Sequence, residues 1–141
     1  MWKSSTSVSS DSDSSCKGLV KGTQVLVSLV TLNDESFLEG CLDSLSKQTI
    51  PLRVMIHDNA STDGTVEIAR SCGCGLRISP RNIGYSAGHN LNLSERAFDI
   101  ALLLNADVKL ASDYLEILLA TIESLPDVGL AGGKILRRER A

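Results

Sequence analysis

The sequence has no long apolar run, no excess of basic residues and only four cysteines. No run approaches the roughly 20 apolar residues that a membrane-spanning helix needs. The N-terminal stretch lacks the apolar core of a secretory signal. The net charge of −3 gives no support for nucleic acid as a partner. We therefore expect no nucleic-acid binding and a cytoplasmic location, which includes a peripheral position at the inner face of a membrane.

Cys72 and Cys74 are separated by one glycine. A zinc site usually takes four Cys or His ligands, and no partnering Cys or His accompanies these two thiols. A soft-metal site at this pair is therefore the weaker alternative. We expect the cysteines to be reduced thiols, either buried or without a role in chemistry.

The 141 residues allow one domain with a core of its own. Hydrophobic residues make up 43% of the sequence and charged residues 22%, which is ordinary for a globular protein. Residues 1–22 are rich in serine with scattered aspartate, and this composition predicts a disordered segment. The folded domain is expected to occupy residues 23–141.

Apolar, β-branched runs alternate with helical patterns along the rest of the chain. The expected strands are Gln24–Thr31, Leu52–His57, Leu76–Ser79, Asp99–Leu104 and Val128–Ile135. One expected helix ends near Lys47, and a second covers Val66–Cys72. A third runs from about Ala87 to Arg96, and a fourth follows a cap at Ser112 or Asp113. Short loops join these segments. The pattern is typical of βαβ units and predicts an α/β fold with a mostly parallel sheet and helices on both faces.

The run DNASTDGT, Asp58 to Thr65, directly follows the second expected strand. Loops that leave the carboxyl ends of strands are where open α/β sheets bind ligands. The carboxylate of Asp58 and the amide of Asn59 can accept from a ring N–H of a planar base and donate to its carbonyl. Asn, Ser and Asp are also common in turns and helix caps. We interpret Asp63 as a cap, and Asp58 with Asn59 as ligand-binding residues.

The stretch Asn82 to Asn90 is a second candidate loop. Glycines at Gly84 and Gly88 allow a backbone to approach a ligand, and a following helix offers N–H groups to an anion. Turns use the same residues, so this pattern is weak on its own. His89 could act as a general base, but a single histidine without a visible partner is more often structural or exposed.

Asn105 and Asp107 end the fourth expected strand and form the third candidate. Two oxygen-bearing side chains at this spacing can hold a hard divalent cation such as Mg²⁺ or Mn²⁺, which would neutralise a diphosphate. Taken alone, the pair is better explained as a turn that ends the strand. The hypothesis of a site depends on all three loops opening at the same edge of the sheet.

In this order, TLNDE, DNASTDGT, NIGYSAGHN and LLLNAD resemble the N-terminal half of a family 2 glycosyltransferase, near its rhamnosyltransferase-like branch. The resemblance covers residues 23–135 and implies a Rossmann-like GT-A fold, truncated after about the fifth strand. It also implies inverting transfer of a hexosyl or rhamnosyl group. The donor would be a dTDP- or UDP-sugar, the acceptor a glycan or a lipid-linked molecule, and the cofactor Mg²⁺ or Mn²⁺.

The resemblance further implies roles for individual residues. Thr31 and Asn33 would flank the nucleotide, and Asp58 with Asn59 would contact its base. The loop around the ribose and diphosphate would contain Asn82, Gly84, Gly88 and Asn90. Asn105 and Asp107 would form the metal motif. Because Asn105 is a neutral amide where the family has an acid, metal binding would be weaker or would depend mainly on Asp107.

The catalytic base of this family lies in a second half that would follow Ala141, and no residue here matches it. Either that half or a partner chain is expected to cover the edge of the sheet. Two other functions remain open. One is a non-catalytic nucleotide-binding module with a decayed site. The other is a sugar-phosphate nucleotidyltransferase, although LNDESF lacks the glycine-rich basic loop of those enzymes.

Overall fold

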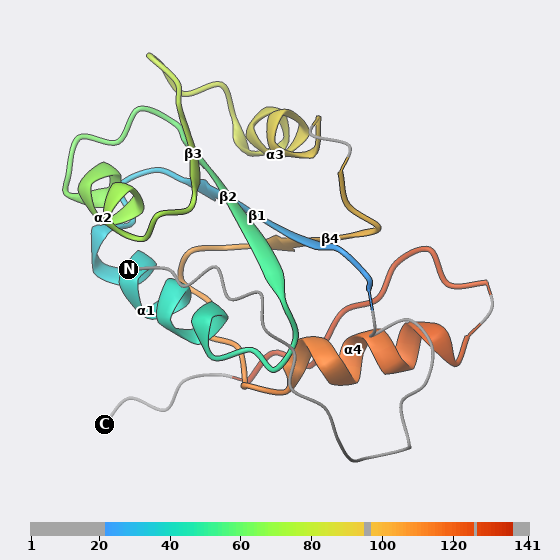
Figure 1. Cartoon of the computed structure of the whole chain (residues 1–141). Helices are drawn as coiled ribbons and strands as arrows, with labels where there is room; N and C mark the ends of the chain where they lie inside the picture. The colour runs from blue at the N-terminus through green and yellow to red at the C-terminus, as the bar shows by residue number, and fades with distance from the viewer. Residues whose placement is uncertain (1–21, 95–96, 126, 137–141) are drawn as a thin grey trace.

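The computed structural model describes residues 22–94, 97–125 and 127–136. Strands and helices alternate along these residues, as the sequence pattern predicts (Figure 1). The elements are β1 (Val25–Thr31), α1 (Glu35–Ser46), β2 (Leu52–Asp58), α2 (Thr65–Ser71), β3 (Gly75–Ile78), α3 (Tyr85–Leu93), β4 (Ile100–Leu104) and α4 (Tyr114–Glu123).

The four strands form one parallel sheet in the order β3-β2-β1-β4. β1 lies between β2 and β4, and all seven of its residues are buried. An unbroken apolar run is what a strand covered on both faces requires. The register pairs Thr31 with Asp58 and Asp58 with Ile78, so the first three strands end side by side.

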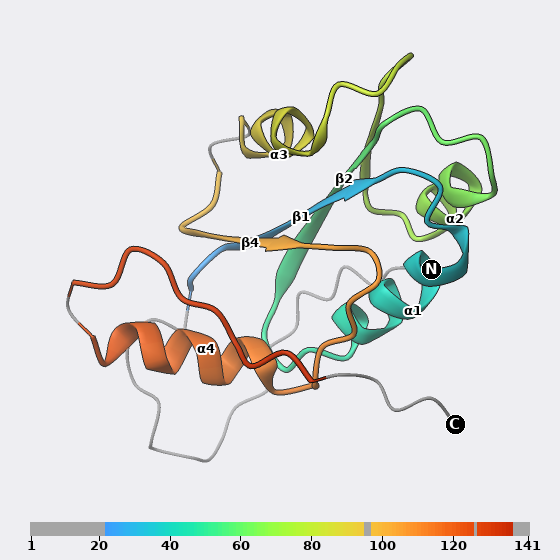
Figure 2. The ribbon, with the colours of Figure 1, turned by 180° about the vertical axis from the view of Figure 1, so that it is seen from behind.

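Helices cover both faces of the sheet, and the predicted α/β fold is confirmed (Figures 1 and 2). α3 lies on one face against β1 and β2, whereas α1, α2 and α4 lie on the other. On that second face, Leu38 and Leu45 of α1 pack against Val27 and Leu29 of β1. Helical spacing in α1 places its apolar residues on the side that meets the sheet.

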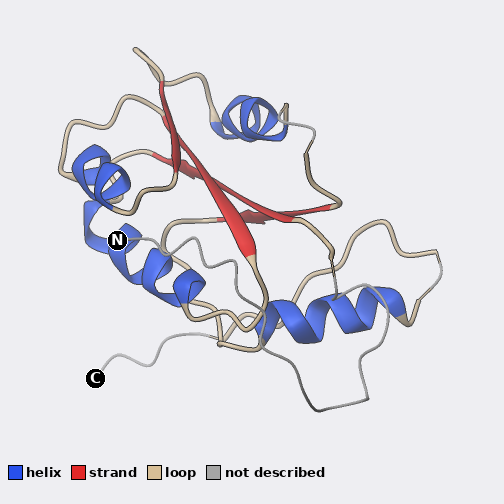
Figure 3. Cartoon of the chain, viewed as in Figure 1, coloured by secondary structure: helices blue, strands red, loops and turns tan. Residues whose placement is uncertain are grey.

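The fifth strand predicted for Val128–Ile135 is wrong, because residues 127–136 contain no strand (Figure 3). This segment runs beside α4, where the Gly133 N–H donates to the Tyr114 hydroxyl at 3.1 Å. Leu130 and Ile135 are 93% and 92% exposed. Glycine loses more backbone entropy in a strand than other residues do. Without burial of these apolar side chains, nothing offsets that cost.

Two further predictions differ from the structure or lie outside it. α3 begins at Tyr85 and ends at Leu93, earlier than the expected helix, and Arg96 is outside the described residues. Of the segment predicted to be disordered, only Gly22 is described, so that prediction stays untested. No helix within the described residues has the length and apolar character needed to cross a membrane.

Candidate functional site

The loops predicted to form the site meet at the carboxyl edge of the sheet. The loop after β1 and the DNASTDGT run are joined by hydrogen bonds around Asn33. The Asn33 side-chain oxygen accepts from the Thr62 N–H at 2.8 Å, and the main-chain N–H of Asn33 donates to the Ser61 hydroxyl at 2.9 Å. Asn33 has a φ of 58°, a left-handed conformation that Asn adopts more readily than most residues. The two loops therefore form one unit.

Asp63 contributes to this unit and to the start of α2. Its carboxylate accepts from the Thr65 N–H at 3.0 Å, from the Thr65 hydroxyl, and from the Glu35 N–H at 3.2 Å. The hydrogen bond with the Thr65 side chain lowers the pKa of Asp63. The N-cap itself is Gly64. Asp63 is therefore not the N-cap that was predicted, although its carboxylate accepts from the first N–H of the helix.

Asp58 is fully buried at the end of β2. Its carboxylate accepts from the Thr31 hydroxyl at 3.1 Å, the Ser61 N–H at 2.9 Å and the Ser61 hydroxyl. Three donors around one carboxylate hold this loop in shape. In this conformation Asp58 faces its own protein, and its contact with a nucleotide base stays a prediction.

Asn59 links the DNASTDGT run to the glycine-containing loop. It is 3% exposed, its N–H donates to the Thr31 carbonyl at 2.9 Å, and its side-chain oxygen accepts from the Ile83 N–H at 3.3 Å. Farther along, the Asn82 side-chain oxygen accepts from the Gly84 N–H at 2.8 Å. Gly84, the N-cap of α3, has a φ of 90° and an exposed position. A side chain would be strained there, so glycine is needed for the turn.

Gly88 and Asn90 lie in α3 and differ in their surroundings. Gly88 is buried against the sheet, where an added Cβ would lie 2.8 Å from a Val30 methyl. Close packing of α3 on the sheet therefore explains the glycine. Asn90 is exposed. The predicted roles of both residues in ligand binding stay untested.

A buried polar layer between α3 and the sheet was missed by sequence reasoning. The Ser28 hydroxyl and His89 Nδ1 are 2.7 Å apart, and the Asn92 amide donates to the Ser28 hydroxyl at 3.0 Å. His57 Nε2 lies 3.0 Å from the Ser79 hydroxyl. An available signal was Ser28, a polar residue in the middle of an apolar run.

The pKa values of the two buried histidines are both lowered from the ordinary value of histidine. Burial lowers the pKa of His89, and the nearby His57 lowers it further. Burial also lowers the pKa of His57, an effect that Asp58 opposes and Arg77 strengthens. Because His89 is 3% exposed and bonded within the polar layer, the structure supports its structural interpretation rather than a role as general base.

Asn105 and Asp107 are both exposed beyond the end of β4. The Tyr85 hydroxyl donates to the Asn105 side-chain oxygen at 2.7 Å, so α3 and this loop are in direct contact. The described residues contain no group of three or more His, Cys, Asp or Glu side chains that could hold a metal ion. One carboxylate suits Mg²⁺ or Mn²⁺ when phosphate oxygens and water supply the other ligands. The residues present therefore fit a cation that is bound together with a diphosphate.

The sequence matches the model of glycosyl transferase family 2 over residues 27–139. The chain belongs to this family. It is 29% identical over 119 residues to glycosyltransferase AglE of Haloferax volcanii, covering 79% of this chain and 39% of that protein. It is 28% identical over 100 residues to glycosyltransferase GlyA of Streptococcus pneumoniae, covering 67% of this chain and 14% of that protein. The chain therefore spans less than half the length of the curated relatives that it matches.

Solved structures of glycosyltransferases have a similar fold. S. aureus TarS 1-349 in complex with UDP-GlcNAc superposes with a TM-score of 0.64 at 22% identity, covering 77% of this chain and 37% of that chain. A mannosyltransferase from Pyrobaculum calidifontis in complex with GDP-Man and Mn²⁺ superposes with a TM-score of 0.60 at 26% identity. This match covers 73% of this chain and 32% of that chain. The resemblance to family 2 glycosyltransferases of the GT-A fold is confirmed.

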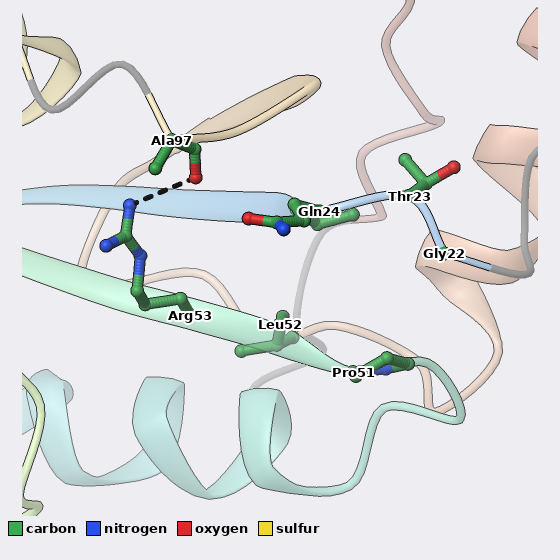
Figure 4. Close-up of a pocket in the computed structure, with 8 residues that line it drawn as sticks. Gly22, Thr23, Gln24, Pro51, Leu52, Arg53 and Ala97 are labelled. Atoms are coloured by element: carbon green, nitrogen blue, oxygen red, sulfur yellow. Dashed lines mark hydrogen bonds between the residues drawn. The ribbon is translucent and has the colours of Figure 1, made fainter.

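A separate hollow of about 320 Å³ opens at the amino ends of β1 and β2 (Figure 4). Thr23, Leu52 and Arg53 line it, and the Arg53 guanidinium donates to the Ala97 carbonyl at 3.4 Å. None of the predicted site residues is among its lining residues. It lies at the end of the sheet opposite to the loops described above.

Proposed function

We propose that this chain is the donor-binding half of an inverting glycosyltransferase. It would bind a nucleotide diphospho-sugar for transfer to a glycan or a lipid-linked acceptor. The observation that carries the proposal is the meeting of the four family motifs at the carboxyl edge of the sheet, where α/β folds bind ligands. The membership of the chain in glycosyl transferase family 2 supports the same function.

The base of the nucleotide is proposed to bind near Thr31, Asn33, Asp58 and Asn59. Its ribose and diphosphate would lie against the loop before α3, with Asn82 and Gly84 on one side and Asn105 and Asp107 on the other. Asp107 would hold Mg²⁺ or Mn²⁺, and such a cation offsets the negative charge of a diphosphate. A related mannosyltransferase binds GDP-Man with Mn²⁺, which supports a metal-bound nucleotide sugar here.

A UDP- or dTDP-sugar is the proposed donor, and a hexosyl or rhamnosyl group the one transferred. The base that deprotonates the acceptor is proposed to lie in a part of the protein that follows Ala141. That part, or a partner chain, would cover the free edge of the sheet. We place the protein in the cytoplasm, including the inner face of the membrane.

Titration calorimetry with a panel of UDP-, dTDP- and GDP-sugars and Mn²⁺ tests the donor site. We expect saturable binding of at least one sugar nucleotide, and Asp107→Ala to weaken it roughly tenfold because it removes the only carboxylate of the metal motif. Asp113→Ala is the matched control, since Asp113 is also exposed and makes no capping hydrogen bond at α4. Absence of binding across the panel would contradict the proposal.

Binding alone does not separate a transferase from a non-catalytic module. A transferase that includes the residues after Ala141 should release nucleoside diphosphate slowly even without an acceptor. If that longer protein binds the donor and releases none, the non-catalytic alternative is the better description.

A further inference from the structure

The contact between Tyr85 and Asn105 joins two parts of the site that are 20 residues apart in the sequence. Tyr85 is the first residue of α3, and Asn105 directly follows β4. The phenol hydroxyl donates to the side-chain oxygen of Asn105 at 2.7 Å. Neither side chain is buried, so both are accessible at the edge where the donor would bind. The contact therefore sets how one site residue presents its amide.

Tyr85 is held in place from the interior of the fold. Its ring meets the His89 ring edge-on, with centroids 4.3 Å apart and an angle of 78° between the planes. This is the preferred geometry for a pair of aromatic rings. His89 is in turn bonded to Ser28 in the centre of the sheet at 2.7 Å. The hydroxyl of Tyr85 is thus positioned by a chain of contacts that begins in β1.

The side chain of Asn105 has one polar group left for a ligand. Its main-chain carbonyl accepts from the Val108 N–H at 3.3 Å and from the Cys41 thiol at 3.7 Å. Its side-chain oxygen accepts from Tyr85. An amide side chain has one oxygen acceptor and two N–H donors. Within the described residues, the Nδ2 group of Asn105 has no protein partner.

We propose that Tyr85 is a positioning residue that fixes the Asn105 amide so that its Nδ2 donates to the diphosphate of the donor. This inference rests on the proposed function. A neutral amide that donates hydrogen bonds attracts a diphosphate, whereas a carboxylate at this position would repel one unless a cation lay between them. Asn105 is then a direct ligand of the nucleotide, and Asp107 alone supplies the negative charge for a cation.

A double-mutant cycle on the 141-residue chain tests the coupling. The probe is whichever of UDP-GlcNAc, dTDP-glucose and GDP-mannose the wild type binds best in calorimetry with Mn²⁺. Tyr85→Phe keeps the ring against His89 and should weaken binding roughly fivefold, the effect of one hydrogen bond. Asn105→Ala should weaken binding at least as much, and the double variant no more than Asn105→Ala, because Tyr85 acts through Asn105.

Tyr114→Phe is the matched control, since it removes the hydroxyl of the other tyrosine, which accepts from the Gly133 N–H in another part of the fold. It should leave the affinity unchanged. An unchanged affinity in Tyr85→Phe, or additive effects in the double variant, would overturn the inference while leaving the proposed function intact. Failure of the wild type to bind any of the probes would overturn both.

A measurement without ligand tests the geometry separately. In ¹⁵N relaxation, the side-chain amide of Asn105 should be ordered in the wild type and in Tyr114→Phe, and mobile on the picosecond to nanosecond timescale in Tyr85→Phe. An amide that is mobile in the wild type, or equally ordered in Tyr85→Phe, would contradict the role of Tyr85. A loss of thermal stability in Tyr85→Phe would not by itself produce a change confined to this amide.

Discussion

Among single residues, burial separates the polar side chains that hold loops in shape from those that are open to the solvent. Asp58 is fully buried and bonded to Thr31 and Ser61. Asn105 and Asp107 are exposed at the same edge. Asn105 and Asp107 are therefore open to the solvent at this edge, whereas Asp58 is enclosed by its own hydrogen-bond partners.

The buried histidines predict a dependence of stability on pH. Their pKa values are lowered in the fold, so the unfolded chain binds more protons below about pH 6.5 and stability falls as the pH falls. A proton added to His89 Nε2 would find no acceptor among the described residues. We expect the free energy of unfolding to fall as the pH drops below about 6.5, by at most about 1.4 kcal/mol per pH unit for each histidine.

Urea unfolding at pH 7 and pH 5 measures this loss, which should be smaller in His89→Asn. The chain has only two histidines, so no exposed one contributes. Cys72, whose pKa is lowered to about 7 by its hydrogen bond with Cys74, titrates nearby, and a Cys72→Ser background removes it. An equal fall in the free energy of unfolding in wild type and His89→Asn would contradict a contribution from the lowered pKa of His89.

Among the elements, α3 depends on close approach to the sheet more than on apolar burial. Its buried residues are Gly88, His89 and Asn92, and the Asn92 amide donates to main-chain carbonyls of both β1 and β2. The first turn of α3 carries Tyr85 and follows the glycine-containing loop. Any shift of α3 away from the sheet therefore moves that side of the site.

Gly88→Ala tests this packing because two effects have opposite signs. Alanine at a helical position would stabilise the helix by about 1 kcal/mol. Its Cβ would lie 2.8 Å from a Val30 methyl and 3.1 Å from the His57 ring, and overpacking of this kind costs about 1–3 kcal/mol. We expect net destabilisation in thermal unfolding. Ser86→Ala, at an exposed position of α3, should be neutral or stabilising. A more stable Gly88→Ala protein would show that α3 moves without cost.

For the whole molecule, the outer edge of β4 is one of two sheet edges that no described strand covers, the other being that of β3. No described strand pairs with the outer edge of β4, and Leu103 of β4 is 50% exposed. Unpaired strand edges with apolar side chains invite association with another strand. The curated relatives that this chain matches are much longer. This difference is consistent with the proposal that a further part of the protein or a partner chain covers the edge.

The open edge predicts self-association of the 141-residue chain as its concentration rises. Sedimentation velocity should detect dimers or larger species, and Leu103→Lys should reduce them because a charge on an edge strand opposes pairing. Ile117→Lys is the control, since Ile117 is 57% exposed but lies on α4. A monomeric wild type at high concentration, or an equal effect of both variants, would contradict pairing at β4.

Much of the fold could be predicted because it depends on local patterns. The apolar run that ends at Thr31 became β1, and the run from Leu52 became β2, each within a residue or so of the expected bounds. The run over Val128–Ile135 also contains apolar residues, but three of its eight residues are glycine, and it forms no strand. A strand forms only where a neighbour supplies hydrogen bonds and burial, and local composition does not carry that information.

The order of strands, helices and loops follows largely from periodicity in the chain, and the four motifs in that order resemble those of the family. Loops after parallel strands must open at one edge, so the place of the site follows as well. The hydrogen-bond partner of each polar side chain does not follow from the sequence. Thr31 with Asp58, Ser28 with His89, and Tyr85 with Asn105 are paired across 27, 61 and 20 residues. Such partners meet only when the sheet and α3 are assembled, because a hydrogen bond depends on distance and direction in space and not on separation along the chain.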